Sequence, residues 1–308
     1  MNRTKQFAAL NNFEQELNAV KSKTLKWQTI CYSGTHINQS ATISAYTSLN
    51  PNSCGDIVLF PGLAANTNID PLMKTLMFWG LTHRRNVFCI DTFLGDFKEK
   101  PSAEDAQKNT YPEFVSLIEQ SIKFIQPFTI PNKNTLIGHS AGATGLTDAL
   151  NNLTAHNINT NAGSVILFAP CFGTQQLGAI NKTIKRRIIS NQGEMPENML
   201  PLASIFDVWQ SKKMRHIYIP QNFVSDMFTS VFKADLIVQW NTHVTIVAAE
   251  NDTKVSLNHL QQCYEQTILQ SDSDVFKFVL LPKTPHSILL PNSNNYKIIN
   301  VVKNQKTK

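Results

Sequence analysis

A serine framed by two glycines is the residue of this chain best suited to nucleophilic chemistry. The stretch Gly138-His139-Ser140-Ala141-Gly142 follows the pattern G-x-S-x-G. This pattern is typical of a sharp turn from a strand into a helix, where side chains at the glycine positions would crowd the backbone. Thr135-Leu136-Ile137 before it is a strand candidate and residues 143–150 after it are a helix candidate. We interpret Ser140 as a nucleophile; the alternative is a serine in an ordinary turn between strand and helix.

Two further residues could complete the chemistry of Ser140. A serine hydroxyl is a weak nucleophile that needs a histidine to accept its proton and a carboxylate to orient that histidine. In folds with a turn of this kind, the acid and then the histidine follow the serine along the chain. Asp252 and His286 follow Ser140 in this order, each just after a strand candidate. The sequence therefore predicts that His286 acts as base and then acid and that Asp252 orients it.

Other histidines and acids compete for these roles. His139 is next to Ser140, and we expect its side chain to point away from the turn and to pack. Three more histidines do not fit the order, because they precede the acid or lie within a predicted helix: His216, His243 and His259. The alternative acids are Glu250, on the same turn as Asp252, and two later residues, Asp272 and Asp274.

Backbone N–H groups at two places could stabilise a negatively charged oxygen during acyl transfer. One belongs to Ala141, directly after the nucleophile, and the other should come from the turn after an earlier strand. Pro61-Gly62-Leu63 follows the strand candidate Ile57 to Phe60. Gly62 allows the chain to turn there, and Leu63 is the predicted donor. A Pro-Gly pair can also mark a plain turn.

Short apolar runs alternate with longer helical patterns along the chain, which predicts an α/β fold with a mostly parallel sheet covered by helices. Two earlier runs, 27–30 and 42–46, alternate apolar and polar residues and predict an antiparallel edge pair. Helices are predicted after the capping residues Asp70, Thr110 and Ser256. The buried-strand candidates are Asp56 to Phe60, Val87 to Ile90, Thr135 to Ile137, Ser164 to Phe168, Val244 to Ala248 and Phe276 to Leu281.

The alternation stops between residues 171 and 241. We interpret this segment as a helical lid inserted into a core formed by residues 1–170 and 242–308, because so long an irregular connection is uncommon in a compact domain. The stretch from Cys171 to His216 contains three acidic and seven basic residues, which gives it a net charge of +4. The basic residues are Lys182, Lys185, Arg186, Arg187, Lys212, Lys213 and Arg215.

The basic part of this insertion could contact an anionic membrane surface, or it could be an ordinary solvated face. Neutralising Lys185, Arg186 and Arg187 should then weaken turnover on anionic vesicles more than turnover of soluble short-chain esters. Equal effects on both would contradict membrane contact.

Charge and composition limit the partners further. The 308 residues carry a formal charge of +6, but the basic residues are spread widely and no nucleic-acid-binding motif is present, so we expect no nucleic-acid partner. The five cysteines are scattered without a CxxC pair, which indicates neither a disulfide framework nor a zinc site. We see no secretory pattern and no apolar run near the roughly 20 residues that span a bilayer. We expect a cytoplasmic protein, with non-classical export still open.

Together these motifs resemble those of the α/β-hydrolase superfamily, and within it the monoacylglycerol lipase, lysophospholipase and carboxylesterase type. The resemblance runs from about Gly55 to Ile288 and rests on the stretches Phe60 to Leu63, Ile90 to Gly95, Gly138 to Gly142, Ala249 to Asp252 and Pro285-His286. It implies an eight-stranded, mostly parallel sheet with a lid after the sixth strand, and ester hydrolysis through an acyl-enzyme without metal or organic cofactor. Two stretches depart from the family, which commonly has His-Gly in place of Pro61-Gly62 and Asp-x-Arg-Gly-x-Gly in place of Asp91 to Gly95.

Three functions are open at this point. The leading hypothesis is a serine hydrolase of lipid-like or short-to-medium acyl esters. The same residues could act on an amide, a thioester or a carbon–carbon bond, because pocket shape decides among these bonds. A catalytically silent fold that serves as a binding module is the third; loss of one of the three residues would favour it, and all three are present in order.

Overall fold

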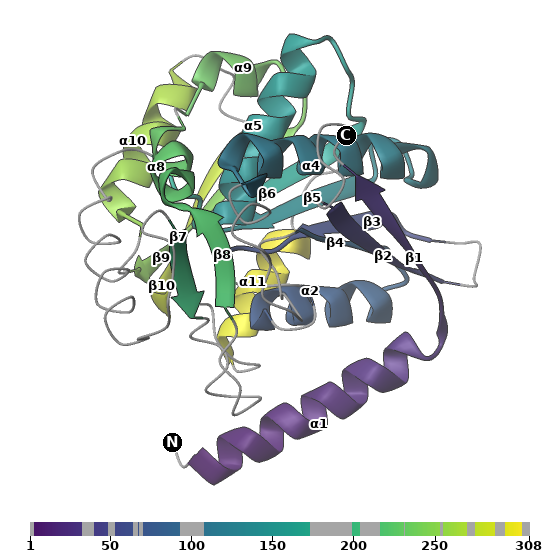
Figure 1. Cartoon of the computed structure of the whole chain (residues 1–308). Helices are drawn as coiled ribbons and strands as arrows, with labels where there is room; N and C mark the ends of the chain where they lie inside the picture. Colours follow the sequence, from purple (N-terminus) through teal and green to yellow (C-terminus); the bar gives the residue numbers. More distant parts are fainter. Residues whose placement is uncertain are drawn as a thin grey trace.

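A computed structural model gives the structure of the protein and describes residues 3–32, 40–48, 53–63, 67, 70–92, 108–172, 199–203, 216–230, 232–252, 255–269, 275–286 and 293–303. Eight strands form one sheet in the order β1-β2-β4-β3-β5-β6-β9-β10 (Figure 1). They are β1 (Thr24–Tyr32), β2 (Ser40–Ser48), β3 (Asp56–Phe60), β4 (Asn86–Asp91), β5 (Asn134–His139), β6 (Ala162–Phe168), β9 (His243–Asn251) and β10 (Phe276–Pro285). The strands of this sheet from β3 onward run parallel, and β1 and β2 form an antiparallel edge next to β4. The predicted sheet is confirmed, including its antiparallel edge pair.

Helices cover both faces of this sheet (Figure 1). One face carries α2 and α11, with α1 packed against α2, and the other carries α4, α5, α8, α9 and α10. The bounds are α1 (Arg3–Lys21), α2 (Pro71–Thr82), α4 (Tyr111–Ile125), α5 (Ala141–Ala155), α8 (Gln221–Thr229), α9 (Ala234–Val238), α10 (Leu257–Ile268) and α11 (Ser293–Lys303).

The three predicted capping residues begin their helices as expected. The Asp70 carboxylate accepts the N–H of Leu72 at 2.9 Å, and a proline occupies the first turn of α2. Thr110 and Ser256 accept N–H groups of the first turns of α4 and α10 with their hydroxyls, at 3.4 and 3.3 Å. A capping side chain satisfies a donor that the helix itself leaves unpaired. Local sequence therefore fixes where α2, α4 and α10 start.

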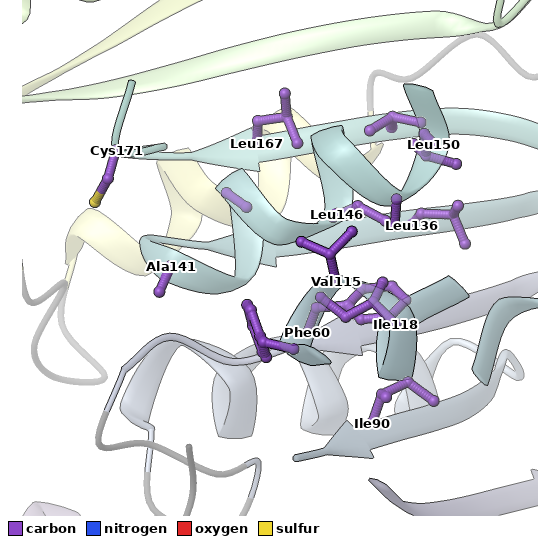
Figure 2. Packing of buried hydrophobic residues seen from close by; sticks show 14 of the residues in the cluster. Phe60, Ile90, Val115, Ile118, Leu136, Ala141, Leu146, Leu150, Leu167 and Cys171 are labelled. Atoms are coloured by element: carbon purple, nitrogen blue, oxygen red, sulfur yellow. The ribbon is translucent and has the colours of Figure 1, made fainter. Parts of the chain in front are cut away.

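The central strands are buried on both faces, so successive residues pack into opposite halves of the core. In β5, Leu136 packs with α4 and α5, and Ile137 packs with α2. Figure 2 shows residues of α4 and α5, among them Val115 and Leu146, lying over the sheet beside Leu136. Packing on both sides holds the end of β5 in place, and Ser140 follows there.

The insertion between β6 and β9 differs in part from the predicted helical lid. Its described residues form α8, α9 and a two-stranded antiparallel sheet of β7 (Met199–Ala203) and β8 (His216–Pro220), which the sequence did not predict. Five-residue apolar runs cannot be assigned to strand or helix by periodicity alone. Phe223 and Phe228 of α8 are buried in the same core as α4 and α5. The basic residues predicted to face a membrane lie outside the described residues, and no described helix is long and apolar enough to cross one.

Candidate active site

The turn between β5 and α5 holds Ser140 in a strained conformation. Its backbone has φ 53° and ψ −122°, a region that residues with side chains rarely adopt. The Ser140 N–H donates to the carbonyl of Phe168 in β6 at 2.8 Å, and its own carbonyl accepts from Ala143 at 3.0 Å. These bonds on both sides of the residue fix the strained turn, as the G-x-S-x-G motif predicts.

The glycines of the motif are required by close backbone contacts. A Cβ on Gly138 would lie 2.5 Å from the Cα of Ala143, and a Cβ on Gly142 would lie 2.3 Å from the carbonyl oxygens of Phe60 and Pro61. Real Cβ atoms do not approach other atoms this closely. The turn therefore packs directly on the end of β3.

Ser140, His286 and Asp252 lie in hydrogen-bonding contact. The Ser140 Oγ is 2.8 Å from Nε2 of His286, and Nδ1 of His286 is 2.7 Å from Oδ2 of Asp252. The side chains of His286 and Asp252 are only 8% and 3% exposed, whereas Ser140 is half-buried. The other carboxylate oxygen of Asp252 accepts the N–H of Val255 at 2.9 Å, which fixes the carboxylate. The structure thus joins the three residues in the order that general-base activation of a serine needs.

The ends of neighbouring parallel strands place these residues. β5, β9 and β10 end at the same edge of the sheet, so Ser140, Asp252 and His286 meet there although 146 positions separate the first from the last. Near this edge β10 bulges, because it advances from Leu281 to Pro285 while β9 advances only from Ala249 to Asn251. Glu250 accepts the N–H of Lys283 in this bulge at 2.6 Å. Glu250 is therefore engaged in the bulge, and Asp252 is the acid in contact with His286. The other two alternative acids, Asp272 and Asp274, lie outside the described residues.

The two segments predicted to carry the oxyanion donors both lie next to Ser140. Ala141 begins α5, and the first N–H groups of a helix have no partner within it and favour negative charge. Gly62, next to Leu63, packs so closely that an added Cβ would lie 3.1 Å from Cβ of Ser140. The turn predicted to carry the second donor is therefore adjacent to the nucleophile.

Asp91 binds Thr67 in the segment that follows this turn, a role that the sequence did not reveal. Its two carboxylate oxygens accept the N–H and the hydroxyl of Thr67 at 2.8 and 2.9 Å. Burial raises the pKa of Asp91 to about 6, although the bonds from Thr67 oppose the shift. Only the place of Asp91 at the end of a strand candidate could have indicated this role.

A buried thiol also touches the nucleophile. The Cys171 Sγ is 3.6 Å from the Ser140 Oγ, and the Cys171 N–H donates to the Thr144 hydroxyl at 2.7 Å. In sequence Cys171 is one of five scattered cysteines, and only its position just after β6 hints at the site. Among the residues that the structure describes, no group of three or more His, Cys, Asp or Glu side chains could hold a metal ion.

The sequence suggested that His139 only packs in the core, but its ring also makes two polar contacts. Its ring is buried, but Nδ1 lies 3.0 Å from the Asp70 carboxylate and Nε2 lies 3.1 Å from the carbonyl oxygen of His286. These partners are 69 and 147 positions away in sequence, so no local pattern could have identified them.

Comparisons with known proteins agree at the level of the fold. No family model matches the sequence, and no curated protein is detectably similar to it in sequence. Among solved structures, an esterase of Pyrococcus furiosus named Pf2001 superposes with a TM-score of 0.59 at 13% identity, covering 94% of this chain and 93% of that one. The α/β-hydrolase GrgF of a Penicillium species has a TM-score of 0.60 at 11% identity and covers 91% and 97%.

A third similar structure is a thioesterase domain from the curacin biosynthetic pathway, with a TM-score of 0.57, 12% identity and coverage of 91% and 99%. At such identities the likeness concerns architecture alone. Together with the sheet order and the turn at Ser140, it shows that this chain has the α/β-hydrolase fold.

Proposed function

We propose that the protein is a serine hydrolase that cleaves carboxylic esters through an acyl-enzyme intermediate. The observation that carries this proposal is the unbroken line of contacts from the Ser140 hydroxyl through His286 to the buried carboxylate of Asp252. The strained turn supports it, because it leaves the hydroxyl half-exposed at the end of the sheet. A binding module has no need of this alignment.

The arrangement assigns the starting protons. Asp252 accepts the hydrogen on Nδ1 of His286, which leaves the lone pair of Nε2 facing the Ser140 hydroxyl. As the Ser140 oxygen attacks the ester carbonyl, its proton passes to Nε2, and the carboxylate of Asp252 stabilises the imidazolium that forms. Burial of both partners strengthens this stabilisation.

The remaining steps use the same groups. The carbonyl oxygen becomes an oxyanion, which the N–H groups of Ala141 and Leu63 would bind. The tetrahedral intermediate collapses, the bond to the alcohol breaks, and His286 gives its proton to the departing alkoxide. A water molecule then loses a proton to His286 and attacks the acyl group on Ser140. The bond between the acyl carbon and the Ser140 oxygen breaks, His286 returns the proton to that oxygen, and the carboxylic acid is released.

Lipid-like and short-to-medium acyl esters are the proposed substrates. Apolar side chains support an apolar acyl group as substrate. Leu63 follows Gly62, the buried Phe172 follows Cys171, and both pack in the same apolar cluster as Ala141, where Phe172 stacks edge-on with Phe232 at 5.0 Å. The similarity to monoacylglycerol lipases and lysophospholipases, the cytoplasmic location and the membrane contact remain predictions from sequence. Amides and thioesters would pass through the same acyl-enzyme and belong in the same assay.

The test is hydrolysis of p-nitrophenyl esters of graded acyl length, with a thioester and an anilide of the best acyl group. We expect burst kinetics on at least one ester, and loss of turnover by about 10⁶-fold in Ser140→Ala. Ser121→Ala is the matched control, since this serine is buried in α4 and its hydroxyl has no hydrogen-bond partner in the structure. Hydrolysis that survives in Ser140→Ala, or a folded wild-type protein inert on the whole panel, would overturn the proposal.

A further inference from the structure

A second Asp–His pair, formed by Asp70 and His139, lies next to the pair of Asp252 and His286. His139 is 4% exposed and Asp70 is 1% exposed, and both ring nitrogens of His139 face oxygen atoms. Nδ1 meets the Asp70 carboxylate at 3.0 Å and Nε2 meets the backbone carbonyl of His286 at 3.1 Å. The His139 and His286 rings lie 5.5 Å apart between centroids.

The partners of the His139 ring determine its protons. A carboxylate oxygen and a carbonyl oxygen can only accept hydrogen bonds, so each ring nitrogen must donate. A neutral imidazole has one N–H and would turn a lone pair toward one of these oxygens, leaving a buried polar contact repulsive and unsatisfied. With Asp70 ionised, the arrangement is satisfied only when His139 carries both protons and a positive charge.

The surroundings stabilise that charge. Burial of the ring lowers the pKa of His139, but the Asp70 carboxylate and the His286 carbonyl outweigh burial and raise it overall, with a contribution from Asp252. The negative charge of Asp70 is held in turn, because its other oxygen accepts the Leu72 N–H at the start of α2. Within the part of the chain that the structure describes, the charged groups that face His139 are Asp70 at the start of α2 and Asp252 after β9, and the titratable ring of His286 lies beside them.

The position of this pair links three parts of the candidate active site. The backbone of His139 leads directly into Ser140, and its side chain binds the backbone of His286. Asp70 ends the loop that begins with the proposed oxyanion turn, and a Cβ added to Gly62 in that turn would lie 3.0 Å from the His139 carbonyl. One side chain therefore bridges the nucleophile, the base and the oxyanion loop.

We propose that His139 and Asp70 form an ionised positioning pair that holds the backbone of His286 in register with Ser140, and that, with the Asp70 carboxylate in place, turnover requires His139 to keep both protons. This inference rests on the proposed hydrolase function for its kinetic part. The pair does not exchange protons with substrate. Its alignment of the base is lost when His139 loses a proton at alkaline pH.

Two variants separate charge from contact. His139→Phe keeps a ring but removes both bonds, and we expect kcat to fall about 10²-fold with little change in KM. Asp70→Asn keeps both bonds with a neutral ring, because the amide nitrogen can donate to the lone pair of Nδ1 while Nε2–H stays on the His286 carbonyl. Protonation of the ring is no longer favoured by a facing carboxylate and would disrupt the amide contact. The wild type should therefore lose kcat toward alkaline pH as His139 loses a proton, whereas Asp70→Asn, whose ring is already neutral, should lack this loss. Protonation of the base His286 lowers kcat toward acid pH in both proteins.

Nitrogen-15 NMR of the histidine rings tests the proton state without any assay of catalysis. The signal assigned to His139 by its absence in His139→Phe should show two protonated nitrogens at neutral pH, and one in Asp70→Asn. Thr110→Ala is the matched control for loss of a helix cap, since Thr110 also caps a helix with a proline in its first turn. It should change stability without altering the pH profile or the His139 signal.

Two results would overturn the inference. One is a His139 ring that is neutral at pH 7 in the folded wild-type protein. The other is an imidazolium at His139 combined with unchanged pH profiles in both variants. Absence of all hydrolysis with the imidazolium present would instead contradict the proposed function, so the two failures are distinguishable.

Discussion

The two Asp–His pairs at the end of the sheet have the same composition and different third partners. In one, Nε2 of His286 faces the Ser140 hydroxyl, a group that can give up a proton. In the other, Nε2 of His139 faces a backbone carbonyl, which can only accept a hydrogen bond. In each pair Nδ1 contacts a carboxylate, at 2.7 Å and 3.0 Å.

This difference teaches that the third partner determines the role of an Asp–His pair. The hydroxyl requires His286 to be neutral with its lone pair on Nε2, so this ring can take up a proton and return it. The carbonyl requires a proton on Nε2 of His139, so this ring holds its proton and acts as a structural donor. The predictions below test that contrast.

The same substitution should have opposite consequences in the two pairs. An asparagine amide in place of either aspartate can donate to Nδ1 and favour the tautomer with its proton on Nε2. In Asp252→Asn that proton points at the Ser140 hydroxyl and removes the base, so kcat/KM should fall about 10⁴-fold. In Asp70→Asn the same tautomer suits the carbonyl, and the loss near pH 8 should stay under about tenfold. Similar losses in both variants would contradict the contrast.

The turn that joins the pairs should tolerate no side chain at Gly142. The added Cβ in Gly142→Ala would meet two carbonyl oxygens at 2.3 Å, and overpacking of this kind costs about 3 kcal/mol. We expect a lower free energy of unfolding in urea and a loss of activity larger than the loss of stability explains. Gly62→Ala should lower the free energy of unfolding by less, because its nearest contacts would be 3.0 and 3.1 Å. Equal stability of Gly142→Ala and wild type would contradict the geometry.

The pH dependence of stability should report the His139 proton. The pKa of His139 is raised in the folded protein, so its stabilisation is complete below the unfolded value of about 6.5 and is lost as pH rises through the folded pKa. The free energy of unfolding should therefore fall on the alkaline side in the wild type. That part of the decrease should be missing in His139→Phe, measured by urea unfolding at several pH values.

Asp91 should affect the free energy of unfolding at lower pH than His139 does. Its pKa is raised to about 6, so between roughly pH 4 and pH 6 the folded protein binds more protons than the unfolded chain and loses stability as pH rises. Asp91→Asn can still bond Thr67 and should remove this slope alone. If the slope above pH 6.5 also changed, Asp91 and His139 would be coupled.

Loss of the Cys171 thiol should have the smallest effect on turnover among these substitutions. Its thiol touches the Ser140 Oγ at 3.6 Å, but sulfur forms weak hydrogen bonds, and removal leaves the contact between Ser140 and His286 in place. We expect Cys171→Ala to lower kcat less than tenfold on short acyl esters. A loss comparable to that of Asp252→Asn would make the thiol part of the catalytic machinery.

The features predicted from sequence are those that local chemistry determines. Near-continuous apolar runs identified β3 to β6, β9 and β10, and Asp70, Thr110 and Ser256 identified three helix starts. The order of Ser140, Asp252 and His286 identified the contacts between them, because parallel strands bring their ends together. Their catalytic roles remain a prediction.

The features that were missed depend on contacts between distant residues or on weak local signals. The contacts of His139 with Asp70 and His286 form only when the end of β5, the start of α2 and the end of β10 meet. The contact of Cys171 with Ser140 forms only when the ends of β5 and β6 meet. Strands β7 and β8 are so short that the periodicity of their apolar residues does not distinguish a strand from a helix. Helix α1 could have been predicted from the sequence, because apolar residues recur there at helical spacing: Leu10, Phe13, Leu17 and Val20.

Labelling with a fluorophosphonate probe tests the central claim most directly, because the probe reacts with a serine only when that serine is activated. Intact mass and peptide mapping should show one adduct on the wild-type protein, located at Ser140, with none in Ser140→Ala and a much slower reaction in Asp252→Asn. Ser121→Ala should label like the wild type. A folded wild-type protein that takes up no probe, or an adduct that persists in Ser140→Ala, would contradict the account of Ser140 as the nucleophile of a serine hydrolase.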